Sequence, residues 1–410
     1  MSAQTWRKVA VIAAVFGAVY LIYSYRGLRV KRETHGRLTH VLESTDKDPQ
    51  ARIDSLESFL LLHEDPRAAS TAYRALLGAH GELGSDSVAL KNVSDRFLAA
   101  DSSSTTHYAV AQLYSARNVY LSEALIHARH ALDGLNSSSI PKNMSEEDWQ
   151  RMKGDISGQM NHMIGNIFVE TGQPDSAVAV LEALVENSPD RPAYLTVLSR
   201  ALAMSGNTSR AIEGYLRVVA LKPDDVAART DLEALFIPDR GDLESLEQQI
   251  TRQRGTERAR RRTKFQEMLI DQEVEPFEIA DSSGEITSST EFLGKVVVLD
   301  FWAAWAGPCL HDLTLFQQAQ SQLSRRNDIA MLAINVDQDT SQARAFLREN
   351  GLTLPIYYKG ETTTTDYHVS GVPMRVIIGP EGRMRFKQVG FDGVGDYVEE
   401  LTWQVDLASR

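Results

Sequence analysis

A spacing of about 34 residues organises the middle of this chain, in the range of known structural repeats. Three features recur at that distance: a turn-like tripeptide, a small residue and a tripeptide with a central proline. The pairs are Thr171-Gly172-Gln173 with Ser205-Gly206-Asn207, Ala177 with Ala211, and Ser188-Pro189-Asp190 with Lys222-Pro223-Asp224. A period of this length is typical of stacked helix pairs, and two pairs alone cannot bury their own apolar faces. The spacing therefore predicts a helical array that continues beyond these two copies.

The surrounding sequence fits such an array. From about Arg32 to Ile237, apolar residues recur every three or four positions, which predicts helices throughout. Two upstream segments, residues 69–100 and 120–135, are interpreted as degenerate units of the same kind. A further helix is expected from about Glu146.

The two copies resemble the tetratricopeptide (TPR) repeat, and a chance pair of helical hairpins is the alternative. The repeat's signature positions are held by Ile164, Gly165, Phe168, Ala177, Leu181 and Pro189 in the first copy, and by Leu198, Ala211, Tyr215 and Pro223 in the second. In the second copy Ser199 stands where a glycine is usual. The resemblance implies an all-α domain that binds proteins.

The N-terminus carries an apolar run bounded by positive charge. Residues 9–25 contain no charged side chain. The basic residues around them are Arg7 and Lys8 before the run, and Arg26, Arg29, Lys31 and Arg32 after it. At 1.5 Å per residue the run reaches roughly 25 Å, enough to cross a bilayer core. A single-pass transmembrane helix is predicted. A cleaved signal peptide is the alternative, but no small-x-small cleavage site follows Ala18.

Two opposed indications bear on the side of the membrane that holds the rest of the chain. Five Lys or Arg residues follow the apolar run, through Arg37, and two precede it, which favours a cytoplasmic location. The family resemblance described below favours the extracytoplasmic (periplasmic) side, and this location is predicted. A net charge of −12 predicts no nucleic-acid partner, since phosphate binding requires a basic surface.

Residues 241–272 are predicted to form a basic linker helix. Its positive side chains are Arg252, Arg254, Arg258, Arg260, Arg261, Arg262 and Lys264. They are interpreted as a solvated helix face, with contact to anionic lipid or to the acidic repeat domain as alternatives.

After residue 273 the pattern changes to alternating strands and helices. Strands are expected at 277–279, 295–301, 329–336, 375–378 and 385–389, and helices at 307–323, 340–350 and 394–408. A β-α-β half followed by a β-β-α half is an α/β arrangement. The predicted protein is multidomain. Its parts are a membrane anchor (1–31), a TPR-like array (32–240), the linker helix (241–272) and the α/β domain (273–410).

One segment carries the chemistry of the α/β domain. Residues 294–309 read GKVVVLDFWAAWAGPC, a buried strand followed by a helix start that contains Cys309, the single cysteine of the chain. Together with Asn335-Val336-Asp337, Val372-Pro373 and Gly379-Pro380-Glu381-Gly382, this segment resembles the membrane-anchored TlpA/ResA branch of the thioredoxin-like family. The resemblance implies a thioredoxin-like α/β fold and a family that serves disulfide reduction outside the cytoplasm.

The chemistry of that family needs two thiols, whereas this chain has one. The first thiol attacks from a helix N-terminus, where its pKa is lowered, and the second resolves the mixed disulfide. Ala306 stands at the first position and Cys309 at the second. Ordinary dithiol exchange is therefore excluded within one chain. A peroxiredoxin activity is excluded too, because the peroxidatic cysteine would also fall near Ala306.

The resemblance assigns further site residues. Asp300 corresponds to the buried acid that exchanges protons with the resolving thiol; a strand-end residue bonded to water is the alternative. Pro373 corresponds to the family's cis-proline, which leaves the backbone of Val372 free to pair with an extended peptide. The facing wall of this groove is predicted to consist of Trp305, Ala306, Gly307 and Pro308, with a core or cap position as the alternative for Trp305.

Two functions follow as hypotheses. In the first, the protein is a membrane-tethered binding or scaffold protein whose groove holds proteins or extended peptide segments non-covalently. In the second, it is a thiol–disulfide oxidoreductase or redox carrier that works through Cys309 alone, helped by Asp300. No cofactor and no metal are expected, since the histidines lack zinc-ligand spacing and no phosphate-binding, dinucleotide-binding or serine-hydrolase motif is present.

Overall fold

The computed structural model describes residues 36–41, 48–63, 65–141, 145–281, 283–323, 325–337, 340–359, 367, 369, 371–390 and 395–410. The predicted membrane anchor, residues 9–25, lies outside these ranges. Within them, no helix combines the length and the apolar character needed to span a bilayer. The chain divides into two compact units: the first comprises the chain through Asn187 together with Arg200–Ser205, and the second comprises Ser188–Ser199 and Gly206–Arg410. The domain boundaries expected from the sequence remain predictions.

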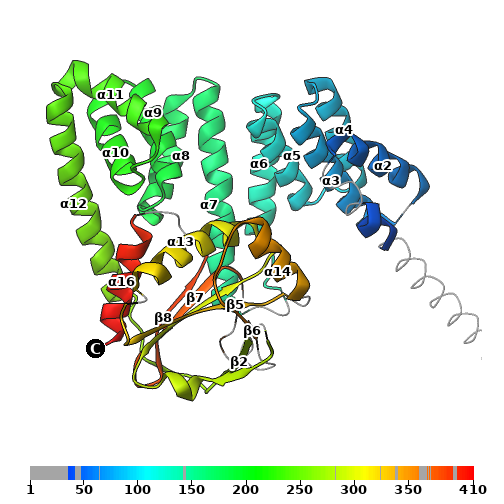
Figure 1. Ribbon diagram of the computed structural model, residues 1–410. Helices are drawn as coiled ribbons and strands as arrows, with labels where there is room; N and C mark the ends of the chain where they lie inside the picture. Colours follow the sequence, from blue (N-terminus) through cyan, green and yellow to red (C-terminus); the bar gives the residue numbers. More distant parts are fainter. Residues whose placement is uncertain are drawn as a thin grey trace, which may run out of the picture. The chain divides into compact units, whose positions relative to one another are not determined.

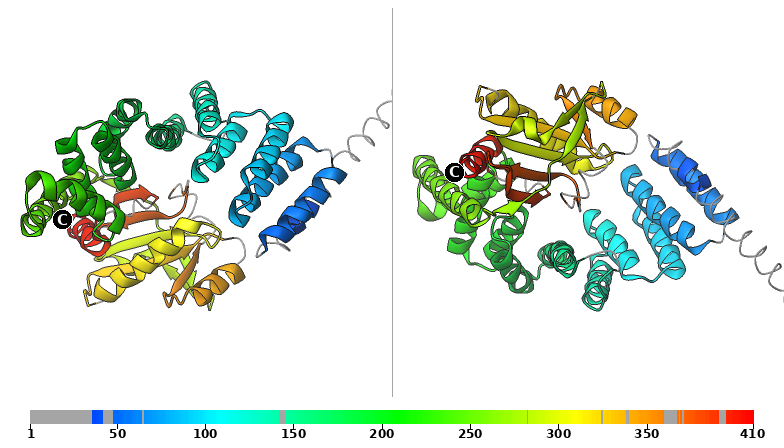
Figure 2. Two further views of the ribbon diagram at one scale, coloured as in Figure 1. Left: turned by 90° about the horizontal axis from the view of Figure 1, so that it is seen from above. Right: turned by 90° about the horizontal axis from the view of Figure 1, so that it is seen from below.

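The first unit is a succession of helices, which Figure 2 shows from above and from below. They are α2 (Pro49–Leu62), α3 (Pro66–Leu83), α4 (Ser87–Ala100), α5 (Ser104–Ala116), α6 (Leu121–Asn136), α7 (Glu146–Glu170) and α8 (Pro174–Asn187). Each of these helices packs against the next one in the chain. Asp48 and Asp65 fix two of the starts, because each carboxylate accepts backbone N–H groups of the following first turn and a proline comes next.

The second unit begins with the continuation of this helical region. Its helices are α9 (Pro192–Met204, shared with the first unit), α10 (Thr208–Leu221), α11 (Val226–Arg240) and α12 (Leu243–Glu267). The starts of α8 and α10 are separated by one repeat period, and so are the starts of α9 and α11. Gly172 and Gly206, also one period apart, both have positive φ, of 70° and 83°, which glycine adopts without strain. The predicted TPR-like helical region is confirmed, and its period reaches a further pair, α11 with α12.

The serine that replaces the usual repeat glycine has a compensating partner. In the first copy, a Cβ added to Gly165 would come within 2.6 Å of the Leu181 side chain. In the second copy the order is reversed. Ser199 on α9 faces Gly214 on α10, where an added Cβ would lie 2.1 Å from Ser199 Oγ. The close approach of the two helices is kept, with the glycine moved to the other helix.

Gly214→Ala is therefore expected to lower the free energy of unfolding by about 1–3 kcal/mol through overpacking against Ser199. The double variant Ser199→Gly, Gly214→Ala should recover most of this loss, because it restores the order of the first copy. Gly255→Ala is the matched control: it lies inside α12 with nothing within 4 Å of an added Cβ, and should gain about 0.5–1 kcal/mol. Urea unfolding measures all three. Equal losses from Gly214→Ala with and without Ser199→Gly would contradict the pairing.

The remainder of the second unit is a mixed sheet with helices packed on it (Figure 1). Its strands are β1 (Gln272–Glu273), β2 (Glu278–Asp281), β3 (Ile286–Ser288), β4 (Val296–Trp302), β5 (Ile329–Asn335), β6 (Ile356–Lys359), β7 (Met374–Ile378) and β8 (Arg383–Val389). The order is β1-β8-β7-β4-β5-β6-β2-β3, with β4, β5 and β6 parallel. The other elements are η1 (Ser289–Phe292), α13 (Gly307–Leu323), α14 (Thr340–Glu349) and α16 (Tyr397–Ala408). The predicted thioredoxin-like α/β domain is confirmed.

The central strand β4 separates two cores. All seven of its residues are buried, as its apolar run predicts. Val296, Val298 and Trp302 belong to one core with residues of α13, α14 and α16, whereas the alternate residues pack on the other face with Phe277 and Tyr367. Asp300 has the parity of the first set, so it points into the apolar core under the helices.

The interpretation of α12 as a solvated basic face holds for Arg252, Arg258, Arg262 and Lys264, which are exposed, but not for the whole helix. Arg261 is only 4% exposed, and its guanidinium donates two hydrogen bonds to Glu400 on α16. Arg260 and Lys264 pair with Asp190, directly before α9. The charges of α12 therefore join the helical region to the thioredoxin-like domain within the second unit.

Candidate functional site

The segment after β4 forms a loop that a side chain holds in place. Asp337 Oδ2 accepts hydrogen bonds from the backbone nitrogen of Ala304, at 2.9 Å, and from Asn335 Nδ2, at 2.8 Å. Helix α13 then begins at Gly307, with Pro308 in its first turn, where the missing N–H group of proline costs no helix bond. The two residues thus lie at the helix start, as the sequence predicts.

Trp305 and Ala306 differ sharply in exposure. The Trp305 side chain is 73% exposed, whereas Ala306 is buried. The exposure of Trp305 rules out the core position that the sequence left open. A large exposed aromatic side chain is a typical anchor of a binding surface.

The Val372–Pro373 segment faces the same edge of the sheet. Its peptide bond is cis, and the Pro373 carbonyl accepts the N–H of Gly390 at 2.7 Å. Within the described ranges, the backbone of Val372 makes no hydrogen bond. Because β4 and β7 are antiparallel with Phe301 opposite Met374, the residues after β4 and those before β7 emerge together. The predicted groove residues are therefore gathered at one edge.

Cys309 lies beneath this edge and is poorly suited to attack. Its side chain is 0% exposed, and its backbone nitrogen donates to the Ala306 carbonyl at 2.9 Å. Burial raises the pKa of Cys309 to about 11, and the carboxylates of Asp300, Asp312 and Asp337 act in the same direction. The thiol is therefore protonated at neutral pH and screened from solvent.

Alkylation of Cys309 by iodoacetamide is expected to be at least about 100-fold slower than that of a free cysteine at pH 7.5. With the pKa of the thiol at about 11, fewer than about one molecule in a thousand carries the thiolate at that pH. The rate should rise about ten-fold per pH unit up to about pH 11. Mass spectrometry of the intact chain against pH measures this, with the urea-unfolded chain as control. A rate that levels off below pH 9 would contradict the buried, uncharged thiol.

Asp300 sits in a buried ionic cluster rather than at a solvated strand end. It is 0% exposed, and neither carboxylate oxygen accepts a hydrogen bond from a described residue. Arg375, opposite it on β7, places Nη2 3.6 Å from Asp300 Oδ1 and 3.1 Å from Asp312 Oδ1. Two buried carboxylates thus share one guanidinium.

Tyr397 of α16 completes the cluster. The Arg375 guanidinium donates to its hydroxyl and lies 4.6 Å from the centroid of its ring. Burial and the neighbouring Asp312 raise the pKa of Asp300 well above its usual range, although Arg375 opposes this. Burial alone would lower the pKa of Arg375, but Tyr397 and the two carboxylates raise it, so the guanidinium stays charged.

Sequence reasoning missed Arg375, Asp312 and Tyr397. A signal for Arg375 exists, since it is a lone charge between the buried residues Met374 and Val376 of β7. Asp312 stands three residues after Cys309 and so lies on the same side of α13. Tyr397 has no comparable signal, because only the packing of α16 brings it to Arg375.

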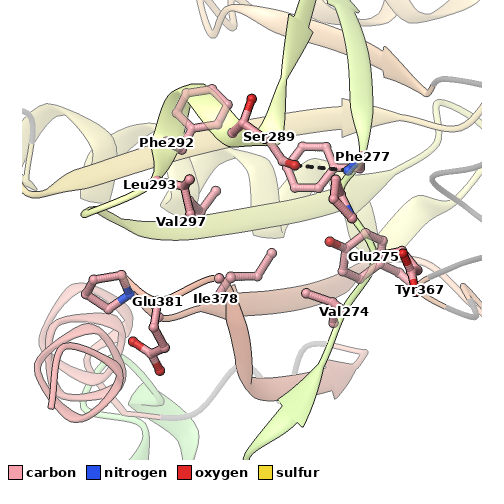
Figure 3. Close-up of a pocket in the computed structure, with 15 residues that line it drawn as sticks. Val274, Glu275, Phe277, Ser289, Phe292, Leu293, Val297, Tyr367, Ile378 and Glu381 are labelled. Atoms are coloured by element: carbon pink, nitrogen blue, oxygen red, sulfur yellow. Dashed lines mark hydrogen bonds between the residues drawn. The ribbon is translucent and has the colours of Figure 1, made fainter.

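A separate hollow, of about 270 Å³, lies at the other end of β4. Figure 3 shows Val297 and Ile378 in its wall, at the start of β4 and the end of β7, together with Phe277, Phe292 and Leu293. None of the predicted site residues lines it. In the part of the chain that the structure describes, no group of three or more His, Cys, Asp or Glu side chains is arranged to hold a metal ion. The absence of a metal remains a prediction.

Comparison with known proteins places both regions. Residues 270–387 match the AhpC/TSA family, and residues 162–226 match the tetratricopeptide repeat. The thioredoxin-like protein YneN of Bacillus subtilis is 30% identical over 122 residues, which cover 29% of this chain and 71% of that protein. The thiol-disulfide oxidoreductase ResA of the same organism is 26% identical over 109 residues, which cover 26% of this chain and 60% of that protein.

Among solved structures, a DsbE-type thiol:disulfide interchange protein from Chlorobium tepidum is 27% identical, with a TM-score of 0.30. The match covers 34% of this chain and 96% of the Chlorobium tepidum chain. StoA from Bacillus subtilis is 21% identical, with a TM-score of 0.28. The match covers 32% of this chain and 96% of the StoA chain. The sheet order, the site geometry and the similarity to these sequence relatives together assign the C-terminal domain to a family. The chain belongs, through its C-terminal domain, to the thioredoxin-like AhpC/TSA family with relatives of the ResA and YneN type, and it carries TPR repeats upstream.

Proposed function

We propose that this protein is a membrane-tethered binding protein whose thioredoxin-like domain holds an extended peptide segment without chemical turnover. The observation that carries the proposal is Ala306 at the position of the attacking thiol, with the Val372 backbone unpaired among the described residues and the Trp305 side chain exposed. Main-chain pairing with an extended peptide supplies affinity that does not depend on a thiol. The TPR repeats suggest protein–protein interaction and would provide the second contact.

The proposal includes the membrane. Residues 9–25 would form the anchor, and the remainder of the chain would lie on the extracytoplasmic side. Its support is the uncharged run in the sequence and the resemblance to the TlpA/ResA branch. Protease treatment of intact cells with a permeabilised outer layer tests it: digestion of residues 36–410 is expected. Full protection there, with digestion after cell lysis, would place the chain on the cytoplasmic side.

The alternative, an oxidoreductase that works through Cys309 alone, has less support. Its thiol is buried and its pKa is raised to about 11, whereas reactive cysteines are accessible and have lowered pKa values. Asp300 is held by Arg375 and carries no hydrogen bond toward the thiol.

Trp305→Ala is expected to reduce partner capture about 30-fold, since a tryptophan anchor that becomes buried in the complex typically contributes about 2 kcal/mol or more to binding. The measurement is a cross-linking pull-down from membranes with the full chain, quantified by mass spectrometry. Leu293→Ala is the matched control, because this side chain is also exposed (62%) but lies before the other end of β4. The wild-type chain should show no insulin reduction. Disulfide turnover at the rate of ResA would overturn the proposal.

A further inference from the structure

A cavity of about 580 Å³ lies within the second unit, away from the thiol position. Its walls come from the end of α10, from α12, from α13 and from the start of α16. Contacts between these elements keep the walls in place. The Gly395 nitrogen donates to the Leu221 carbonyl at 3.0 Å, and Arg261 Nη2 donates to Glu400 at 2.6 Å. The cavity is therefore part of the fold, of a size that binds small molecules or a few residues of a peptide.

The cavity is lined by two positive and two negative side chains, and one of the positive ones has no partner among the described residues. Arg258 and Glu399 both line it and pair with each other, and the Asp396 carboxylate caps α16 by accepting from the Glu399 nitrogen at 3.0 Å. Arg254 also lines it, yet forms no ion pair or hydrogen bond with any described residue. Its Nε atom is buried without a partner. A buried N–H group without an acceptor is costly, and an anion that accepts from the Arg254 guanidinium would relieve the cost.

Another part of the lining is apolar. Pro223, Leu315 and Val398 line it, and the Tyr397 ring adds an aromatic surface. A ligand that fits both parts of the lining has one anionic, planar group for the guanidinium and an apolar body. Carboxylate is a planar anionic group that matches an arginine by two parallel hydrogen bonds.

We propose that this cavity binds a carboxylate carried on an apolar body, with Arg254 as its anchor. Such a carboxylate can belong to a small organic acid or to an acidic residue of a peptide with hydrophobic neighbours. The site is distinct from the Val372 groove and does not depend on peptide capture there.

The test is calorimetric titration of the purified full chain with two probes, 4-phenylbutyrate and the peptide N-acetyl-Leu-Glu-Leu-amide. Their uncharged counterparts are 4-phenylbutyramide and the Gln peptide. At least one acid is expected to bind with 1:1 stoichiometry, about ten-fold tighter than its uncharged counterpart, and the tighter of the two acids identifies the source. Equal binding of acid and amide, or no binding of either acid, would overturn the proposal.

Variants test whether the calorimetric binding of the acids takes place in this cavity. Arg254→Met should weaken acid binding about ten-fold and leave amide binding unchanged. Arg254→Lys should retain part of the acid binding, since lysine keeps the positive charge but lacks the planar donor pair of the guanidinium. Arg262→Met is the control, an exposed arginine on the same helix that does not line this cavity. Thermal unfolding confirms that each variant is folded. Acid binding that survives Arg254→Met, or that falls equally in Arg262→Met, would refute the assignment.

Discussion

Ala306→Cys is expected to convert this chain into a disulfide reductase, with insulin reduction at least about 100-fold above the wild-type rate. The position lies directly before α13, so the N–H groups and the dipole of the helix would stabilise the thiolate of the introduced residue. Cys309 lies three residues on, beneath the surface, where a resolving thiol belongs. The remaining frame, including the cis Val372–Pro373 bond, is in place.

Two control variants test the introduced thiol and the resolving thiol separately. Ala306→Ser has a similar size but no thiol and should stay inactive. Ala306→Cys combined with Cys309→Ala should form a mixed disulfide that is not resolved, visible as an added mass without turnover. If Ala306→Cys is folded, with an unchanged unfolding midpoint, and still inactive, the substrate groove has diverged. The argument for peptide capture at Val372 would then fall with it.

The fold was predictable where apolar residues follow a long, regular pattern. The run that forms β4 and the periodicity of α13 gave the correct elements, and the observed bounds of α13 are those predicted. The strands β1, β3 and β6 were missed, because segments of two to four residues carry too few apolar positions to show a period. The packing of α12 against α16 was missed for another reason: seven positive side chains suggested a solvated helix, whereas one of them, Arg261, is buried and paired with Glu400 of α16.

The candidate site likewise contains residues that the sequence predicts and residues that it does not. Trp305, Ala306 and Cys309 lie within one short segment, so a motif reveals them together. The pair of Asp300 with Arg375 depends on the register of β4 and β7, two strands that are far apart in the chain, and no local pattern fixes that register. Residues that act through tertiary contacts are therefore the ones that a single sequence hides.

Arg375→Met is expected to lower the free energy of unfolding by about 3–5 kcal/mol at pH 7.5, because removing one partner of a buried ionic cluster leaves an uncompensated charge in the core. The substitution keeps most of the side-chain volume but leaves Asp300 and Asp312 buried without their shared cation. Urea unfolding of the full chain measures the loss. Met374, the buried neighbour of Arg375 on β7, offers a control in Met374→Leu, which should cost less than about 1.5 kcal/mol.

The pH dependence of this loss distinguishes charge from packing. Burial raises the pKa of Asp300 in the folded state, so the folded chain holds a proton that the unfolded chain releases above about pH 4. Stability therefore falls as pH rises from about 4 toward the folded-state pKa. Without Arg375 that pKa rises further, so the deficit of Arg375→Met should be smallest near pH 4 and largest at pH 7–8. Adding Asp300→Asn removes the titrating group, and it should flatten the profile and recover part of the loss. A deficit that is constant between pH 4 and 8 would mean that Arg375 acts through packing, and the ionic cluster would then be a consequence of the core rather than a condition for it.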